Sequence, residues 1–125
     1  MKKSEYFSLK FLDEKIVFID QTRLPFEEIY IETDSYERIA EAIERLEIRG
    51  APLIGIAAAY AVALSVKNLV IDTEANFNKA YLRLKATRPT AVNLFYALNE
   101  MKKVFEANKT SDDLYHLLFQ KADEL

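Results

Sequence analysis

The residues of this chain best suited to chemistry lie around its two glycines, Gly50 and Gly55. Arg49-Gly50-Ala51-Pro52 stands directly before a long apolar run. Glycine lets a backbone turn and approach a ligand without a Cβ in the way, and proline in the first turn of a helix costs no hydrogen bond. The free amides at such a helix start attract an anion, and a guanidinium adds two parallel hydrogen bonds to a phosphate. The stretch indicates a phosphate site, with a plain turn and a solvated arginine as the alternative.

A second segment of the same kind follows at Thr87-Arg88-Pro89-Thr90. Here too an arginine precedes a proline, and the apolar residues that follow predict a helix with Pro89 in its first turn. Thr87 and Thr90 offer hydroxyls for capping or for ligand contact, and Asn93 faces the same end one turn later. The alternative is that Thr87 only caps this helix. The side chains that would surround one oxyanion are Arg49, Arg88, Thr90 and Asn93.

The first part of the chain has the short periodicity of β-strands. We expect three strands, over residues 7–12, 16–20 and 28–32, with a polar turn at Asp13-Glu14-Lys15 between the first two. The sequence predicts an α+β fold in which a small antiparallel β-meander over residues 1–33 is followed by a helical bundle over residues 34–125. The two parts together are expected to form one domain.

From Asp34 onward, apolar residues recur at helical spacing. A cluster of capping residues at 33–35 precedes the first helix. The run from Ala51 to Val66 is apolar on all sides, so we expect a helix at the centre of the bundle, with Gly55 and Ala59 as small contacts one turn apart. This run is shorter than the ~20 residues that cross a bilayer, which argues against a membrane role.

Three further helices complete the predicted bundle. Asp72 or Thr73 caps the third helix, Pro89 begins the fourth, and the fifth starts near Ser111. Residues 67–72 and 107–110 are expected to be surface connections. The apolar residues that these patterns assign to the core are Tyr36, Ile39, Ile43, Leu46, Phe77, Ala80, Tyr81, Leu84, Leu94, Leu98, Met101, Phe105, Leu114, Leu117 and Leu118.

Composition limits the classes of function. A chain of 125 residues, half of them hydrophobic, can bury one core. With 20 acidic and 17 basic residues and a net charge of −3, the chain lacks the basic surface that nucleic acid requires. The absence of cysteine excludes disulfides and thiolate metal sites, and the single histidine argues against an imidazole metal site. No apolar leader of the secretory type follows Met1, so we expect a cytoplasmic protein with no metal or organic cofactor.

Three ordered segments carry a family resemblance. They are Asp20-Gln21-Thr22-Arg23-Leu24-Pro25, the Arg49-Gly50-Ala51-Pro52-Leu53-Ile54-Gly55 run with its continuation to Tyr60, and Thr87-Arg88-Pro89-Thr90-Ala91-Val92-Asn93-Leu94. In order and approximate spacing they resemble the N-terminal domain of the methylthioribose-1-phosphate isomerases. That family is grouped with regulatory subunits of translation initiation factor 2B and with archaeal ribose-1,5-bisphosphate isomerase. The resemblance covers essentially the whole chain.

The resemblance implies an aldose–ketose isomerase of methionine salvage and amino-acid biosynthesis, which converts 5-methylthioribose 1-phosphate to 5-methylthioribulose 1-phosphate. It implies substrate contacts near the phosphate at Arg49, Gly50, Ala51 and Arg88. The family's acid/base cysteine and aspartate belong to a C-terminal Rossmann-like domain, so the resemblance implies no catalytic residue in this chain. We therefore expect an N-terminal domain that is inactive alone, works with its own catalytic domain on a phosphorylated pentose, and belongs to a homodimeric parent.

The same residues are also compatible with functions other than this isomerase. One is a ribose-1,5-bisphosphate isomerase or a regulatory subunit like that of initiation factor 2B, and another is a non-catalytic module for interaction or dimerisation. Within the resemblance, Asp20 and Gln21 serve either the turn before Leu24-Pro25 or a substrate contact. His116 lies among apolar neighbours and is predicted to be a helix-surface or interface residue without a catalytic role.

Overall fold

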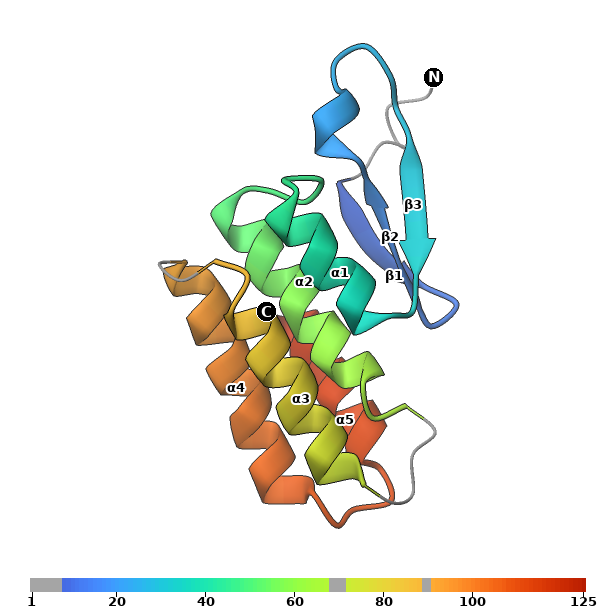
Figure 1. The fold of residues 1–125 in the computed structure, drawn as a ribbon. Coiled ribbons are helices and arrows are strands. Elements are labelled where there is room, and N and C mark those ends of the chain that lie inside the picture. The colour runs from blue at the N-terminus through green and yellow to red at the C-terminus, as the bar shows by residue number, and fades with distance from the viewer. Residues whose placement is uncertain (1–7, 68–71, 89–90) are drawn as a thin grey trace.

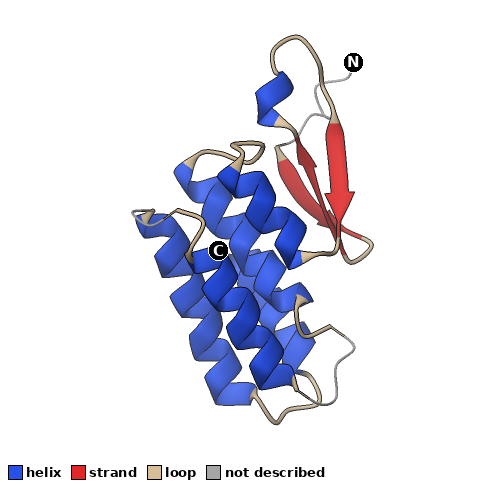
Figure 2. Ribbon diagram, viewed as in Figure 1, coloured by secondary structure: helices blue, strands red, loops and turns tan. Residues whose placement is uncertain are grey.

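The computed structural model describes residues 8–67, 72–88 and 91–125, and it confirms the predicted α+β fold (Figure 1). In the described residues, an antiparallel sheet in the order β1-β2-β3 is followed by five α-helices. Figure 2 shows the sheet lying against one end of the helical bundle. The strands are β1 (Leu9–Leu12), β2 (Lys15–Ile19) and β3 (Tyr30–Thr33), and a 3-10 helix, η2 (Gln21–Arg23), stands between the last two. The helices are α1 (Tyr36–Glu44), α2 (Ala51–Leu64), α3 (Thr73–Lys85), α4 (Val92–Asn108) and α5 (Leu114–Glu124).

A tight turn sets the register of the first hairpin. Asp13 and Glu14 have φ values of 53° and 62°, the left-handed pair that a two-residue hairpin requires, and Leu12 pairs with Lys15. The turn is therefore one residue shorter than predicted. The third strand was expected over residues 28–32 but begins later, at Tyr30, because pairing to β2 places Tyr30 opposite Ile19.

Aromatic side chains join the sheet to the bundle. Phe11 of β1 stacks on Tyr60 of α2 with ring centroids 5.0 Å apart, and its ring lies 4.6 Å from that of Phe119 in α5. The Tyr60 hydroxyl donates to the carboxylate of Asp123, and burial together with this carboxylate raises the pKa of Tyr60. The sheet and the bundle therefore share one core.

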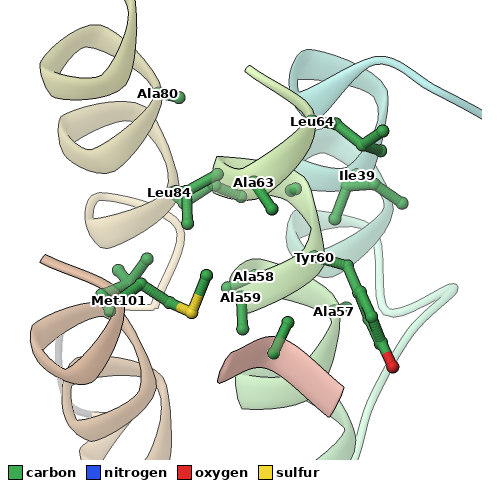
Figure 3. Close-up of a cluster of buried hydrophobic side chains, with 14 of the residues drawn as sticks. Ile39, Ala57, Ala58, Ala59, Tyr60, Ala63, Leu64, Ala80, Leu84 and Met101 are labelled. Atoms are coloured by element: carbon green, nitrogen blue, oxygen red, sulfur yellow. The ribbon is translucent and has the colours of Figure 1, made fainter. Parts of the chain in front are cut away.

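Helix α2 is the centre of that core, as its uniform hydrophobicity predicts. It contacts α1, α3, α4 and α5 as well as β1 and β2. Its small side chains face larger ones from the surrounding helices, and Figure 3 shows Leu84 and Met101 directed toward the alanines of α2. A Cβ built on Gly55 would lie 2.9 Å from the backbone oxygen of Asn93 in α4. The predicted role of Gly55 as a small contact is thus confirmed.

The end of α1 departs from the prediction at Leu46. Ser35 caps the start of α1 as expected, with its hydroxyl accepting from the amide of Arg38 at 3.2 Å. At the other end, the amide of Glu47 donates to the carbonyl of Ala42 at 2.9 Å and that of Leu46 to Ile43 at 3.3 Å, which is a Schellman motif. Leu46 holds the left-handed position, with φ of 66°, and is 44% exposed. It was predicted to be a core residue, which is wrong because the motif turns its side chain outward.

The predicted core is otherwise largely correct. Tyr36 and Leu117 are half-buried, and the remaining predicted residues are buried: Ile39, Ile43, Phe77, Ala80, Tyr81, Leu84, Leu94, Leu98, Met101, Phe105, Leu114 and Leu118.

The starts of α4 and α5 differ from the predictions, whereas α3 begins at Thr73 with Asp72 at the cap position, as predicted. The first residue before α3 is Asp72, in a left-handed conformation and without a capping hydrogen bond from its side chain. Helix α4 begins at Val92 because Ala91 is extended, so the predicted start at Pro89 is wrong, and Pro89 itself lies outside the described residues. Helix α5 begins at Leu114, later than predicted, because Ser111 forms a turn in which its hydroxyl accepts from the amide of Asp113 at 3.1 Å.

A charged clamp joins α1 to α3. Nε of Arg83 lies 3.0 Å from both carboxylate oxygens of Glu37, and its terminal nitrogens lie 2.8 and 2.9 Å from those of Glu44. The hydrogen bond from Arg83 is the main reason that the pKa of Glu44 is lowered. The clamp therefore joins α1 to α3 through charged side chains.

Candidate functional site

The start of α2 has the backbone geometry that the Arg-Gly-Ala-Pro segment predicts. Gly50 precedes the helix with φ of 98° and ψ of 130°, a conformation that residues with a Cβ rarely adopt. The first helical hydrogen bond runs from the amide of Ile54 to the carbonyl of Gly50, at 3.0 Å. The amides of Gly50, Ala51 and Leu53 therefore have no carbonyl partner within the helix, and no side chain in the described part of the chain caps this end.

Arg49 is held at the edge of this helix start. Ile48, directly before it, is fully buried, and the Ile48 amide donates to the carbonyl of Ala42 at 3.2 Å. Arg49 itself is exposed. The guanidinium therefore extends from a fixed backbone toward solvent.

The start of α4 is the second predicted segment. Arg88 is half-buried, and its carbonyl accepts from the amide of Ala91 at 3.1 Å in a turn before the helix. Among the described residues, no side chain caps α4. The buried Thr87 hydroxyl donates to the carbonyl of Leu84 at 2.6 Å, so Thr87 closes α3 and the expectation that it caps α4 is wrong. Thr90 lies outside the described residues.

The two helix starts are neighbours. Figure 1 shows the beginnings of α2 and α4 at the same end of the bundle. A groove of about 300 Å³ lies between them, and its lining includes Pro52 and Gly55 from α2 and Asn93 from α4. The structure thus places exposed Asn93 beside the first turn of α2, and among the described residues the lining of the groove includes neither Arg49 nor Arg88.

The arginines of the chain differ in their partners. The structure describes all six, and Arg23, Arg38, Arg45 and Arg83 each form an ion pair with a carboxylate. No described carboxylate pairs with the other two, Arg49 and Arg88. These are the two arginines for which the sequence predicts a phosphate contact. Their charge is therefore available to a ligand at the end of the bundle where α2 and α4 begin.

The turn after β2 adjoins this end of the bundle. Asp20 is 7% exposed, and its carboxylate accepts from the amide of Thr22 at 2.9 Å and from the Thr22 hydroxyl at 2.5 Å. Asp20 therefore serves the turn, which is one of its two predicted roles. The amide of Gln21 donates to the carbonyl of Glu47 at 2.9 Å, which connects η2 to the segment before Arg49.

Sequence reasoning missed Glu47. It is 9% exposed, and its carboxylate lies 2.7 Å from a terminal nitrogen of Arg38. Nothing in the sequence pattern indicates this pair, because the two residues are separated by the end of α1 and meet only through the Schellman turn.

The other features of the described residues do not form a competing candidate site. No group of acidic residues and histidine there could hold a metal ion, and none of the helices described combines the length and hydrophobicity needed to cross a bilayer. His116 is exposed on α5, where its ring lies 5.7 Å from that of Tyr115. A hollow of about 800 Å³ is lined, among described residues, by α4 alone, so it is an open helix surface.

Fold and site together define an α+β domain with a candidate anion site at two adjacent helix starts. The profile of the Initiation factor 2 subunit family matches residues 47–125, a region that includes both arginine segments. The chain belongs to this family.

Named relatives divide into enzymes and an initiation factor subunit. Proteins named methylthioribose-1-phosphate isomerase from Geotalea daltonii and Geobacter sulfurreducens are 47% and 45% identical to this chain, over 84% and 92% of its length. These matches cover 32% and 35% of the two relatives, so the chain spans about a third of their length.

Two solved structures share the fold. One is 5-methylthioribose 1-phosphate isomerase from Pyrococcus horikoshii OT3, with a TM-score of 0.88 and 33% identity over 98% of this chain and 39% of that protein. The other is subunit delta of the translation initiation factor eIF-2B from A. fulgidus, with a TM-score of 0.84 and 32% identity over 94% of this chain and 35% of that protein.

Proposed function

We propose that this chain is the phosphate-binding part of an aldose–ketose isomerase that converts 5-methylthioribose 1-phosphate to 5-methylthioribulose 1-phosphate in methionine salvage. The names and identities of its enzyme relatives support this reaction. The observation that carries the binding role is the pair of arginines without a described carboxylate partner, Arg49 and Arg88, at two adjacent helix starts.

Each residue of the site has a distinct part in the proposal. Arg49 and the backbone amides of Gly50 and Ala51 anchor the phosphate, because the helix start offers free donors and a positive dipole end. Arg88 adds a second positive charge. Asn93 and Thr90 are further candidates for contact with the phosphate or the sugar.

The chemical steps belong to other parts of the protein. Conversion of the aldose to the ketose opens the sugar ring and moves hydrogen between C1 and C2, directly or as a hydride-like shift. The phosphate site holds these carbons in position and the acid/base groups lower the barrier. We propose that those groups lie in a Rossmann-like domain C-terminal to residues 1–125, and that this chain alone is inactive. A cytosolic homodimer with no metal or organic cofactor completes the proposal.

Two other functions remain candidates. The likeness to subunit delta of the A. fulgidus initiation factor favours a regulatory subunit that binds a phosphorylated ligand without converting it, and ribose-1,5-bisphosphate isomerase is the related enzyme alternative. A module for interaction or dimerisation alone would need no phosphate site. Phosphate binding therefore separates the first two from the third.

Titration of the chain with 5-methylthioribose 1-phosphate, followed by the backbone amide signals in NMR, tests the proposal. We expect the signals of Gly50 and Leu53 to shift, and the unphosphorylated sugar to leave them in place. Loss of a charged hydrogen-bonding partner is worth about 1.5–3 kcal/mol, so Arg49→Ala should raise Kd by about 10- to 150-fold. Arg45→Ala is the matched control, because Arg45 is also exposed and pairs with Glu41. Equal binding by the Arg49→Ala and Arg45→Ala variants would refute the site.

A further inference from the structure

The short segment between α1 and α2 is held by several contacts to neighbouring elements. Glu47, two residues before Arg49, is tied through its amide, its carbonyl and its side chain. We propose that Glu47 is a positioning residue, which fixes the turn at Arg49 and Gly50 so that the guanidinium and the free amides of α2 meet one phosphate. This inference rests on the proposed phosphate site.

The backbone of Glu47 connects two elements. Its amide donates to the carbonyl of Ala42 in the last turn of α1, at 2.9 Å. Its carbonyl accepts from the amide of Gln21 in η2, also at 2.9 Å. The segment is therefore fastened on one side to α1 and on the other to the turn that follows β2.

The side chain of Glu47 adds a third connection. Its carboxylate lies 2.7 Å from a terminal nitrogen of Arg38, and the Arg38 guanidinium stands over the ring of Phe18, 5.9 Å from the centroid. Phe18 is fully buried in β2. Since an ion pair that is largely removed from water adds little net stability, this pair is better explained by the geometry that it imposes.

Leu46 supports the same conclusion. Helices commonly end with glycine in the left-handed position of a Schellman motif, since a side chain there costs about 1–2 kcal/mol. Here leucine holds that position with φ of 66° and keeps nearly half of its surface exposed. Backbone strain of this kind persists only where the surroundings hold it, and such positions concentrate at binding sites.

Loosening this segment should weaken phosphate binding without changing the residues that contact the phosphate. If Glu47 no longer held the turn, binding would have to order one or two residues, each costing about 1–2 kcal/mol, which corresponds to a rise in Kd of about five- to thirty-fold for one residue. A residue important only for global stability would leave Kd unchanged while the chain stays folded.

The test compares Glu47→Gln with Glu44→Gln in the 125-residue chain, at a temperature where both are fully folded. Glu44 is the matched control because its carboxylate also pairs with an arginine, Arg83, but that pair joins the end of α1 to α3 and does not include Glu47. The probes are inorganic phosphate and 5-methylthioribose 1-phosphate, and Kd comes from the amide shifts of Gly50 and Leu53. We expect Glu47→Gln to raise Kd by about five-fold or more and Glu44→Gln to leave it unchanged.

A charge swap supplies the rescue. Arg38→Glu combined with Glu47→Arg retains an opposite pair in the same place, and we expect it to bind more tightly than either single change. Equal loss of binding in Glu44→Gln and Glu47→Gln would overturn the inference, as would a swap that restores stability but not binding. If Glu47→Gln does not fold, Arg38→Gln is judged by the same criterion.

Failure of the inference can be told apart from failure of the proposed function. Wild-type binding by Glu47→Gln, with binding lost in Arg49→Ala, would remove the positioning role and leave the phosphate site. Wild-type binding by both variants would remove the site itself.

Discussion

The close approach of α2 and α4 at Gly55 predicts that Gly55→Ala destabilises the protein. A Cβ at this position would meet the backbone oxygen of Asn93 at 2.9 Å and the Cβ of Ala97 at 3.4 Å. Alanine gains about 1 kcal/mol over glycine in helix propensity. Overpacking costs about 1–3 kcal/mol, and the upper part of that range applies because a helical carbonyl cannot rotate away. The net loss of unfolding free energy should be about 1–2 kcal/mol.

Urea denaturation followed by far-UV circular dichroism measures this loss, with an unchanged m-value showing that the unfolding reaction is the same. Asn78, exposed within α3, provides the calibration, because comparison of Asn78→Ala with Asn78→Gly measures helix propensity without packing. We expect alanine to be the more stable residue at position 78 and the less stable one at position 55. A stabilised Gly55→Ala variant would refute the reasoning, since it would mean that α2 and α4 are not in tight contact there.

Two further changes test the clamp and the core. Arg83→Gln should lower the unfolding free energy by about 1 kcal/mol, and the loss should shrink in high salt because the ion pairs are partly exposed. The pKa of Glu44 is lowered in the folded state, so its stabilising effect is complete above the ordinary carboxyl value of 4.5 and is lost as pH falls through the lowered value. Acid titration of stability should therefore be shallower in Arg83→Gln than in the wild type, and equal slopes would contradict the clamp. Phe105→Ala removes a ring stacked 4.2 Å from that of Phe77 and should cost about 3–5 kcal/mol in urea denaturation, whereas a loss below about 1 kcal/mol would place the ring outside the core.

Much of the fold could be predicted from the spacing of apolar residues along the sequence. The period of the apolar residues separates strands from helices, and the run after Pro52 predicts a buried central helix because no polar face interrupts it. The arginine segments were predictable as a site for the same reason, since glycine, proline and arginine act through their own local chemistry. The adjacency of Pro52 and Asn93 supports that prediction, while the contacts to a phosphate stay predictions.

The errors arise where local signals compete. Pro89 and Ser111 are typical of helix starts, yet α4 and α5 begin three residues later because turns at Arg88 and Ser111 use the first backbone groups. Leu46 fits the apolar stripe of α1, but it has the left-handed backbone conformation that usually requires glycine at the end of a helix. The sequence pattern therefore gave no sign that the helix ends before Leu46. The Arg38–Glu47 pair depends on that turn, so no spacing rule predicts it.

The position of α2 has a consequence for the entropy of binding. One end of this helix offers free amides to solvent, and the rest is enclosed by four helices and two strands. Because α2 is held in place by its neighbours, the amides at its start are already ordered before a ligand binds. Binding there costs the protein little conformational entropy. Hydrogen exchange should therefore be slowest in the middle of α2 with or without ligand, and a phosphate should protect only the first turn. The site would then behave as a preorganised one, in which affinity depends on the ligand and its guanidinium partners more than on folding of the protein around them.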